Sequence, residues 1–579
     1  MADSATLTVS AGAGTLPRVR LKPERRTLYG ALLLCVVALF TAAPVLYVIV
    51  TSFDVALPHQ PYAFGLEGWI EVFDNRKTWN SVLVTLTLTL RAPIAICVAF
   101  VVCWLLVRIE IPGRRFIELT LWFGFFLPGV PMAMGWILLL DESHGLLNLG
   151  LKQLGLPALF GIHSVPGIMW VHFALTTVPV MVILLAPAFR QLDAAFEEAA
   201  EVSGSGIGHR LRRITIPLLA PALMTAFIAS LIRSLEAFEI EQLLGTPAGI
   251  YNYGTRVYDL IFREPPLLPQ ALALSALFLA ILVVLAIPYH RFLLRAAGRP
   301  TISGRGVRIG AAARPAWTFA ASAFVILYVV ITIILPFAVL IAGSFTRLFG
   351  FFFLKDPWTT AHWTAILADD RFARAALNSI GLGLAVGIVG IVVFALLAWA
   401  LVRTDWKYRS WVSLLVWLPW AIPGLVLSLT LMSLMISLPL FTWLNGTILP
   451  LVVAMLIKEL PIGVQLVRAS LTQVSRQLEE AAEISGAGFL WLFVRVTLPL
   501  IAPTLVAVFL LVFAATVRDI STIVLIAAPG MRTLSLLMFD FAVSGRFEPS
   551  AVLGVIVAAI SLATTIAAVA LGRHVGIGR

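Results

Sequence analysis

Apolar stretches long enough to cross a lipid bilayer recur along the whole of this 579-residue chain. A transmembrane helix needs about 20 predominantly apolar residues, and about twelve stretches are candidates. They lie at 28–52, 80–107, 116–140, 166–189, 221–245 and 269–293, and again at 317–343, 377–402, 410–435, 448–468, 503–527 and 550–572. The sequence therefore predicts an all-α, polytopic membrane protein of about 12 transmembrane helices.

The distribution of charge also indicates a protein embedded in the lipid bilayer. Charged residues make up 12% of the chain, about half the share that is usual in a soluble domain. The formal net charge is +11, and a basic balance can indicate nucleic acid binding. Here the arginines cluster between apolar stretches, as cytoplasmic loops of membrane proteins require. We therefore expect a multi-pass protein with both termini cytoplasmic and no nucleic acid partner.

Composition divides the chain into five segments. Residues 294–316 are rich in Gly, Ala and Arg and lack apolar periodicity, which is typical of a linker. The prediction is an N-terminal cytoplasmic tail at 1–27, a first transmembrane unit at 28–293, a cytoplasmic linker at 294–316, a second unit at 317–572 and a C-terminal cytoplasmic tail at 573–579.

An internal repeat relates the two units. Residues 197–223 align without a gap with residues 479–505, an offset of 479 − 197 = 282. An even number of predicted spans separates the copies, so both face the same side of the membrane. The units are therefore predicted to be parallel six-helix repeats, related by an axis along the membrane normal.

Both copies carry one motif, in a predicted cytoplasmic loop between the fourth and fifth spans. Its residues are Glu198, Ala199, Ala200, Gly204 and Pro217 in the first copy, and Glu480, Ala481, Ala482, Gly486 and Pro499 in the second. The acidic start favours a helix, the glycine ends it, and we expect the proline to open the next span. The product is a short, acid-tipped helix on the membrane face, either an interfacial helix or a docking element.

This motif resembles the EAA loop of binding-protein-dependent ABC importer permeases, and the resemblance extends over essentially the whole chain. It implies a bacterial inner membrane protein whose two motif helices couple to a cytoplasmic dimer of ATPase subunits. It also implies an extracytoplasmic substrate-binding protein as partner. In that family Glu198 and Glu480 would meet basic groups of the ATPase, and the two glycines would permit the turn.

The chain itself lacks the usual means of ATP hydrolysis and of metal binding. None of its six lysines follows a glycine, which excludes the Gly-Lys-Ser/Thr ending of a phosphate-binding loop. Its eight histidines and three cysteines have no metal-ligand spacing. We therefore expect a translocation subunit that is not an enzyme, with no cofactor of its own.

Within the family, a fused two-unit permease of this length resembles the ferric-iron type. Residues 235–250 and 517–541 resemble the corresponding segments of ferric-iron permeases. Relatives for thiamine, polyamine or phosphonate share the architecture and remain alternatives. A secondary transporter with parallel repeats is a more distant alternative, because it has no use for two acidic loops at matching positions.

Charged residues near the outer ends of the fifth spans mark a candidate translocation path. Glu236, Glu239, Arg518 and Asp519 are costly in a bilayer unless they pair or face the bundle interior. Arg518 stands at the repeat offset from Glu236, so these two charges could meet across the pseudo-twofold axis. Structural salt bridges at the membrane edge are the alternative interpretation.

Prolines interrupt the third span of each half, at Pro128 and Pro131 and at Pro419 and Pro423. Broken helices often line a transport path, although proline is also common in membrane helices generally.

Overall fold

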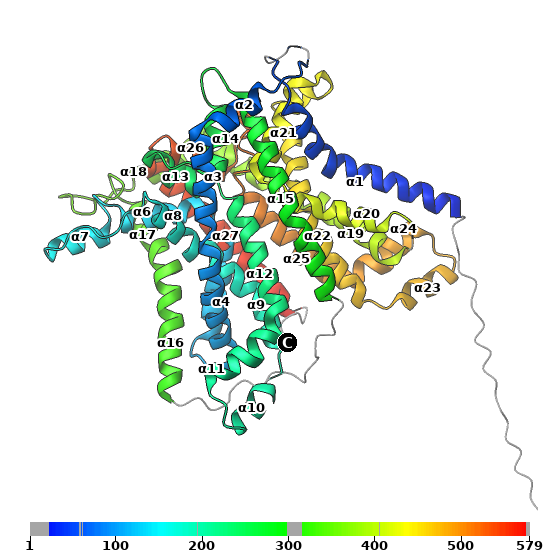
Figure 1. The fold of residues 1–579 in the computed structure, drawn as a ribbon, viewed down its shortest axis with the longest axis horizontal. Helices are drawn as coiled ribbons and strands as arrows, with labels where there is room; N and C mark the ends of the chain where they lie inside the picture. Colours follow the sequence, from blue (N-terminus) through cyan, green and yellow to red (C-terminus); the bar gives the residue numbers. More distant parts are fainter. Residues whose placement is uncertain are drawn as a thin grey trace, which may run out of the picture.

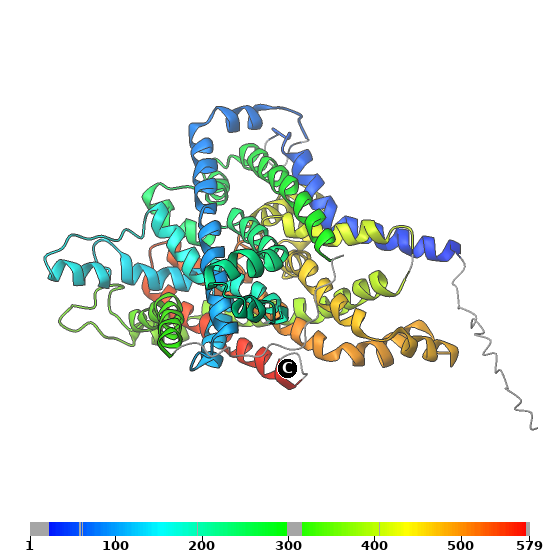
Figure 2. The same cartoon turned by 60° about the horizontal axis from the view of Figure 1, so that its bottom comes forward.

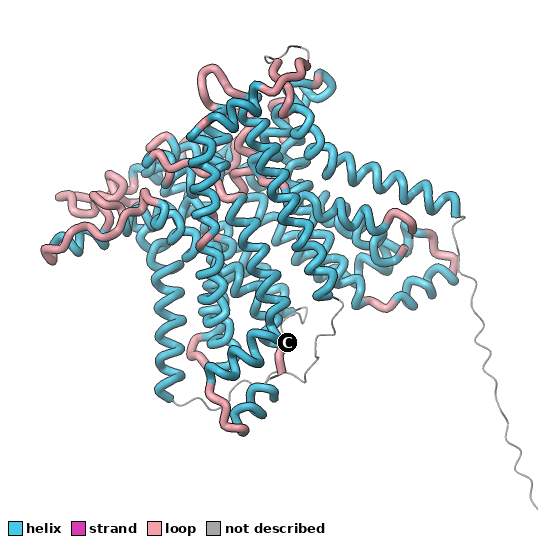
Figure 3. The backbone as a smooth tube through the Cα atoms, viewed as in Figure 1, coloured by secondary structure: helices cyan, strands magenta, loops and turns pink. Residues whose placement is uncertain are grey.

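The computed structural model describes residues 23–297 and 315–574, apart from 57–59, 61, 194 and 405. The described residues are helical and contain no strand (Figure 3). Most of the predicted linker and tails lies outside them. The first-half helices are α1 (Pro23–Thr51), α2 (Glu67–Asp74), α3 (Arg76–Thr89), α4 (Arg91–Arg108), α5 (Arg114–Phe126), α6 (Gly129–Leu140), α7 (Leu146–Gln153), α8 (Val165–His172), α9 (Val178–Gln191), α10 (Ala195–Val202), α11 (Ile207–Arg210), α12 (Ile216–Leu235), α13 (Glu239–Leu244), α14 (Tyr253–Ile261) and α15 (Leu268–Ala297).

The second half repeats the order of the long helices, but turns at 521–526 stand where the first half has α13. Its α-helices are α16 (Pro315–Val329), α17 (Leu335–Gly343), α18 (Ala361–Leu367), α19 (Asp370–Arg403), α20 (Arg409–Trp417), α21 (Gly424–Ser437), α22 (Leu449–Gln473), α23 (Arg476–Ile484), α24 (Phe489–Leu492), α25 (Leu498–Arg518), α26 (Leu534–Val543) and α27 (Phe547–His574). The π-helical turns are η1 (Phe173–Thr177), η2 (Leu211–Thr215), η4 (Val330–Ile334) and η7 (Phe493–Thr497), and the 3-10 turns are η3 (Thr246–Ala248), η5 (Leu418–Ala421), η6 (Pro439–Leu444) and η8 (Pro529–Met531).

The described residues include 10 helices long and apolar enough to cross a membrane, or up to 12 if each of two bent pairs is one span. The bent pairs are the third spans, where α5 meets α6 at 107° and α20 with η5 meets α21 at 100°. Leu127 and Ile422 have extended backbone, with ψ of 134° and 113°, because a following proline disfavours the helical region. The predicted interruption at Pro128 and Pro423 is therefore confirmed, whereas Pro131 and Pro419 lie within helical segments beside the break.

The fifth spans begin earlier than predicted. The long apolar helices are Ile207–Leu235 and Phe489–Arg518, so the expectation that Pro217 and Pro499 open these spans is wrong. Each proline instead follows a π-helical turn inside the span. A proline cannot donate the ordinary helical hydrogen bond and crowds the carbonyl one turn earlier, and a wider turn accommodates that defect.

Every π-helical turn in the described part of the chain is followed by a proline. The turns η1, η2, η4 and η7 each end two residues before a proline, at Pro179, Pro217, Pro336 and Pro499 respectively. Proline thus widens these helices without ending them.

The first helix of each half packs on the other half. Helix α1 contacts α20 and α21, and α17 contacts α6 while α16 contacts α5. Figure 1 shows the result, with α1 leaving the body beside the second-half helices and α16 standing beside α4. The approach of α6 to α17 is close, since a Cβ on Gly135 would lie 2.2 Å from the carbonyl oxygen of Pro336. The two parallel repeats are therefore interlocked.

A second local repeat follows each first span. The indole of Trp69 donates to Ser52 Oγ at 3.3 Å and stacks on Phe53 at 5.6 Å. In the second half Trp363 donates to Ser344 at 3.2 Å and stacks on Phe345 at 5.4 Å. An isolated β-bridge closes the loop in both places. Sequence comparison missed this repeat because few residues other than these anchors are shared.

Candidate functional site

The Glu-Ala-Ala motif of each half forms a short helix that ends at its glycine. Gly204, after α10, and Gly486, after α23, have left-handed backbone with φ of 80° and 86°. In both helices the amide one residue beyond the glycine donates to the carbonyl five residues earlier, at 2.9 and 3.0 Å. This is a helix end that favours glycine, because a side chain is strained at positive φ. The structure thus contains the turn expected from the sequence.

The first glutamate of the second motif, which sequence reasoning missed, faces the protein interior. Glu479 is 5% exposed. Its carboxylate lies 2.9 Å from Arg403 Nε and accepts a hydrogen bond from the Thr497 hydroxyl at 3.0 Å. Arg403 also donates to the carbonyl of Val474 at 2.9 Å. Helix α23 is thereby fixed at once to the end of α19 and to η7.

The first half repeats this anchor. Glu197 lies 3.1 Å from Arg108 Nε and accepts from the Thr215 hydroxyl at 2.7 Å. Arg108 donates to the carbonyl of Leu192 at 3.2 Å. The sequence could have indicated this network. A threonine stands at the same place in both motif copies, Thr215 and Thr497, and an arginine ends the second span of each half, Arg108 and Arg403.

The second glutamate and the apolar flanks of each motif point outward. The exposed residues of α10 include Phe196, Glu198, Ala199 and Val202, and those of α23 include the repeat-equivalent Leu478, Glu480, Ala481 and Ile484. Val202 is 90% exposed and Ile484 65% exposed. We call these two sets the docking surfaces. Large apolar side chains left bare at matching positions are typical of a surface that another protein covers.

The two docking surfaces lie far apart in the molecule. Figure 1 shows α10 at the end of one arm and α23 at the end of the other. The turned view in Figure 2 also keeps these segments, coloured teal and orange, well apart. Each docking surface is therefore accessible to a partner of its own.

All four residues of the predicted translocation path line one cavity of about 230 Å³. Glu236 and Glu239 enter it from the end of α12 and the start of α13, and Arg518 and Asp519 enter from the end of α25. The helix breaks of the third spans line it as well, through Pro128, Gly129 and Gly424. Free backbone groups and charged side chains thus meet where the halves meet.

Ion pairing in the cavity differs from the prediction for Glu236 and Arg518. No ion pair joins these two residues, both of which the structure describes. Instead Lys458 pairs with Asp519 and donates to Thr522 Oγ1 at 2.8 Å. Equivalent backbone positions therefore do not give paired side chains here.

Arg518 is held by the broken third span of the other half. Its guanidinium donates to the carbonyl oxygen of Phe125 and lies 5.3 and 6.0 Å from the ring centroids of Phe125 and Phe126. That carbonyl is available because α5 ends at Phe126. A second contact across the halves joins the Ser521 amide to Glu239 Oε1 at 3.4 Å. Both cross-half contacts lie at the wall of the cavity.

The first half also buries charge that the second half lacks. His172 Nε2 lies 2.8 Å from Glu241 Oε1, and Arg91 donates to a backbone carbonyl at 3.0 Å. In the second half, Ala454 stands at the position equivalent to His172 and Ile523 at the position equivalent to Glu241. The cavity is therefore asymmetric around the axis that relates the docking surfaces.

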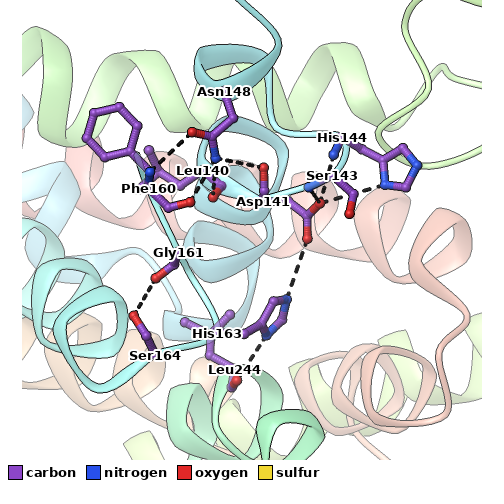
Figure 4. Close-up of polar contacts among 10 residues, drawn as sticks. All are labelled: Leu140, Asp141, Ser143, His144, Asn148, Phe160, Gly161, His163, Ser164 and Leu244. Carbon is purple, nitrogen blue, oxygen red and sulfur yellow. Dashed lines mark hydrogen bonds and ion pairs between the residues drawn. The ribbon is translucent and has the colours of Figure 1, made fainter. Parts of the chain in front are cut away.

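A polar cluster ties the segment after α6 to α13 (Figure 4). Asp141 accepts from two backbone amides at 2.8 Å, and buried Asn148 bonds both ends of the loop. His163 Nδ1 lies 3.0 Å from the Leu244 carbonyl, so this nitrogen carries the proton, and Nε2 lies 3.8 Å from Asp141 Oδ2. Since Leu244 ends the helix that begins at Glu239, the cluster positions one wall of the cavity. Among the described residues no group of three His, Cys, Asp or Glu side chains is placed to hold a metal ion.

Comparison with known proteins gives a consistent set of similarities. Residues 92–297 and 390–577 match the sequence model of a family described as "Binding-protein-dependent transport system inner membrane component". The chain is 24% identical over 546 residues, 91% of its length and 94% of the relative's, to the "Fe(3+)-transport system permease protein FbpB 2" of Haemophilus influenzae. It is 24% identical to the "Probable ABC transporter permease protein y4fN" of Sinorhizobium fredii, covering 86% of this chain and 88% of the relative. It is 23% identical to the "Ferric transport system permease protein FbpB" of Actinobacillus pleuropneumoniae, covering 66% and 55%.

Proposed function

Because this chain belongs to the family of binding-protein-dependent transport system inner membrane components, we propose that it forms both halves of the pathway of an ATP-driven importer of ferric iron. The observation that carries the proposal is the pair of docking surfaces. Each is an exposed acidic and apolar helix, ended by a left-handed glycine and fixed to the body by a glutamate that pairs with an arginine, half-buried in the first half and buried in the second.

Two separate ATPase subunits are the proposed occupants of the docking surfaces, one on each arm. The same arginine, threonine and carbonyl contacts anchor both motif helices, which supports two equal partners. Glu198 and Glu480 point outward and are available to basic groups of an ATPase, although Glu480 also lies 3.1 Å from Arg476 within its own helix. The glutamate anchors would let movement of the ATPase pull on the second and fifth spans, which carry Arg108 and Thr215 in the first half and Arg403 and Thr497 in the second. Both termini are proposed to lie on this cytoplasmic side.

The cavity between the halves is the proposed path for cargo delivered by an extracytoplasmic binding protein. Glu236, Glu239, Arg518 and Asp519 all face it. As the arms move, the contacts of Arg518 with Phe125 and of Glu239 with Ser521 would break and form again, because each joins one half to the other. The helix break after α5 gives Arg518 a free carbonyl at Phe125 without disturbing a continuous helix.

Ferric iron is the proposed cargo because two of the relatives above are named as ferric transport permeases, one of them matching almost end to end. The proposal is tested with the chain reconstituted in liposomes with its ATPase and with an iron-loaded binding protein. Uptake of radioactive ferric iron on ATP addition is the expected result. ATP-dependent uptake of another ligand, with none of iron, would reject the cargo but leave the coupling intact.

The coupling is tested by a double substitution of the left-handed glycines, Gly204→Val with Gly486→Val. Valine is strained at positive φ, so both helix ends should deform, and association with the ATPase and uptake should be lost. Gly206→Val with Gly488→Val is the matched control, because these glycines have open space around them and φ of −69° and −71°. Normal ATPase association and uptake in the first variant, or equal loss in the control, would contradict the assignment.

A further inference from the structure

Helix α2, between the first span and α3, has three different faces. Gly68 and Val72 are buried, and a Cβ on Gly68 would lie 2.8 Å from the backbone of Pro269. Ile70 and Phe73 form a second face and are 55% and 45% exposed. A third face is acidic and exposed, and it consists of Glu67, Glu71 and Asp74. One face packs on protein. The two exposed faces differ sharply in polarity, and on the acidic one Glu71 also accepts a hydrogen bond from Gln270.

The bare apolar face continues onto the lipid-facing side of a membrane span. Phe73 lies 6.0 Å from the ring of Trp79, whose indole donates to the Phe73 carbonyl at 2.7 Å. Trp79 begins a stripe of exposed apolar residues along the helix Arg76–Arg108. The stripe consists of Trp79, Leu83, Leu86, Leu90, Ile94 and Val101. Their spacing of three, four and seven residues places them on one face of the helix.

The length of this stripe fixes the depth of α2. From Trp79 to Val101 a helix rises about 33 Å at 1.5 Å per residue, close to the roughly 30 Å of a bilayer's hydrocarbon core. Beyond Val101 the span ends at Arg108, which is anchored to α10 on the side of the docking surfaces. Trp79 therefore stands at the opposite edge of the hydrocarbon. Helix α2 crosses the end of α3 there, as Figures 1 and 2 both show.

We infer that α2 lies in the headgroup region of the membrane leaflet opposite the docking surfaces and binds lipid through Ile70 and Phe73. The acidic face meets water, and the exposed Arg76 and Lys77 lie at the level of the lipid phosphates. Aromatic residues with a polar edge are typical of this depth. The second half offers only part of this face, since by the tryptophan repeat exposed Leu367 stands at the position of Phe73 but Thr364 stands at that of Ile70.

The test places a nitroxide label on each exposed face in turn, in the full chain with Cys35, Cys97 and Cys103 replaced by alanine. Labels at Ile70→Cys and Phe73→Cys are compared with labels at Glu71→Cys and Asp74→Cys, in liposomes. Oxygen dissolves in lipid and a nickel chelate stays in water. The ratio of oxygen to nickel collisions should be several-fold higher at the two apolar positions.

Equal ratios at all four positions would overturn the inference. The same measurement is repeated with an excess of the binding protein. If that protein shields the two apolar positions from both reagents, the face is a protein contact and the lipid assignment is wrong. An unchanged high ratio supports it. All four positions are surface positions, so gel filtration of each variant serves as the folding control.

Discussion

Replacing Glu479 by alanine should loosen helix α23 far more than replacing its neighbour Glu480. Glu479 is the buried partner of Arg403, whose side chain is itself only 9% exposed. In the variant, Arg403 keeps the Val474 carbonyl but loses its counter-charge, and the Thr497 hydroxyl loses its acceptor. An arginine left buried without its carboxylate is the costly part of this change.

The free-energy cost of Glu479→Ala follows from the burial of the ion pair. Removing one partner of a buried ion pair costs about 3–5 kcal/mol, and we take ~3 kcal/mol because α23 opens locally. Since about 1.4 kcal/mol is a factor of ten in an equilibrium constant, the open population of α23 should rise about 100-fold. Glu480 and Arg476 are both more than half exposed, and such a pair within one helix contributes only about 0.3–0.5 kcal/mol. Glu480→Ala should therefore change opening about twofold, since about 1.4 kcal/mol is tenfold.

Amide hydrogen exchange measures this difference directly, on the purified chain in lipid nanodiscs without its partners. The amides of α23 in Glu479→Ala should exchange about 100-fold faster than in the parent, and those of α10 should not change. Arg403→Met in the Glu479→Ala background removes the unpaired charge and should recover part of the protection. Equal exchange in the two glutamate variants, or a larger effect at Glu480, would refute the anchoring role of the buried pair.

Gly135→Ala should destabilise the interlocked halves by about 1–3 kcal/mol through overpacking against the backbone of α17, lowering the thermal midpoint, whereas Gly150→Ala, in open space, should not. Asp519→Asn should abolish uptake by leaving Lys458 without its carboxylate, and adding Lys458→Met should restore part of the chain's thermal stability; a double variant no more stable than the single one would contradict that pairing. His163→Phe should speed hydrogen exchange in α13 without changing α23, and equal exchange of α13 in parent and variant would show that this histidine does not position the helix.

The sequence identifies the broken third spans because proline acts locally. Pro128 and Pro423 fix the backbone of the residue before them, whatever surrounds them. The same residue type misleads at Pro217 and Pro499, since a proline at the start of a helix and a proline behind a π-helical turn read alike in one dimension. Only the continuous course of Ile207–Leu235 and Phe489–Arg518 distinguishes them.

Side-chain partners were the harder part of the site to predict. The motif contains two adjacent glutamates, and their roles depend on which way the helix is turned. Arg403 and Thr497, distant in sequence, fix that rotation and bury Glu479. In the same way, the repeat offset places Glu236 and Arg518 at equivalent backbone positions, but the free carbonyl of Phe125 captures the guanidinium.

The exchange of first helices has a consequence for how the chain is made. Helix α1 is synthesised long before its partners α20 and α21, which follow more than 350 residues later at Arg409–Ser437. Until then α1 stands in the bilayer with that face against lipid, and the first half cannot reach its final packing alone. Helix α16, by contrast, meets a completed α5 and α6 as soon as it is inserted. The packing of α1 therefore waits for the second half, and joining both halves in one polypeptide guarantees that its late partners arrive in the same membrane in equal number.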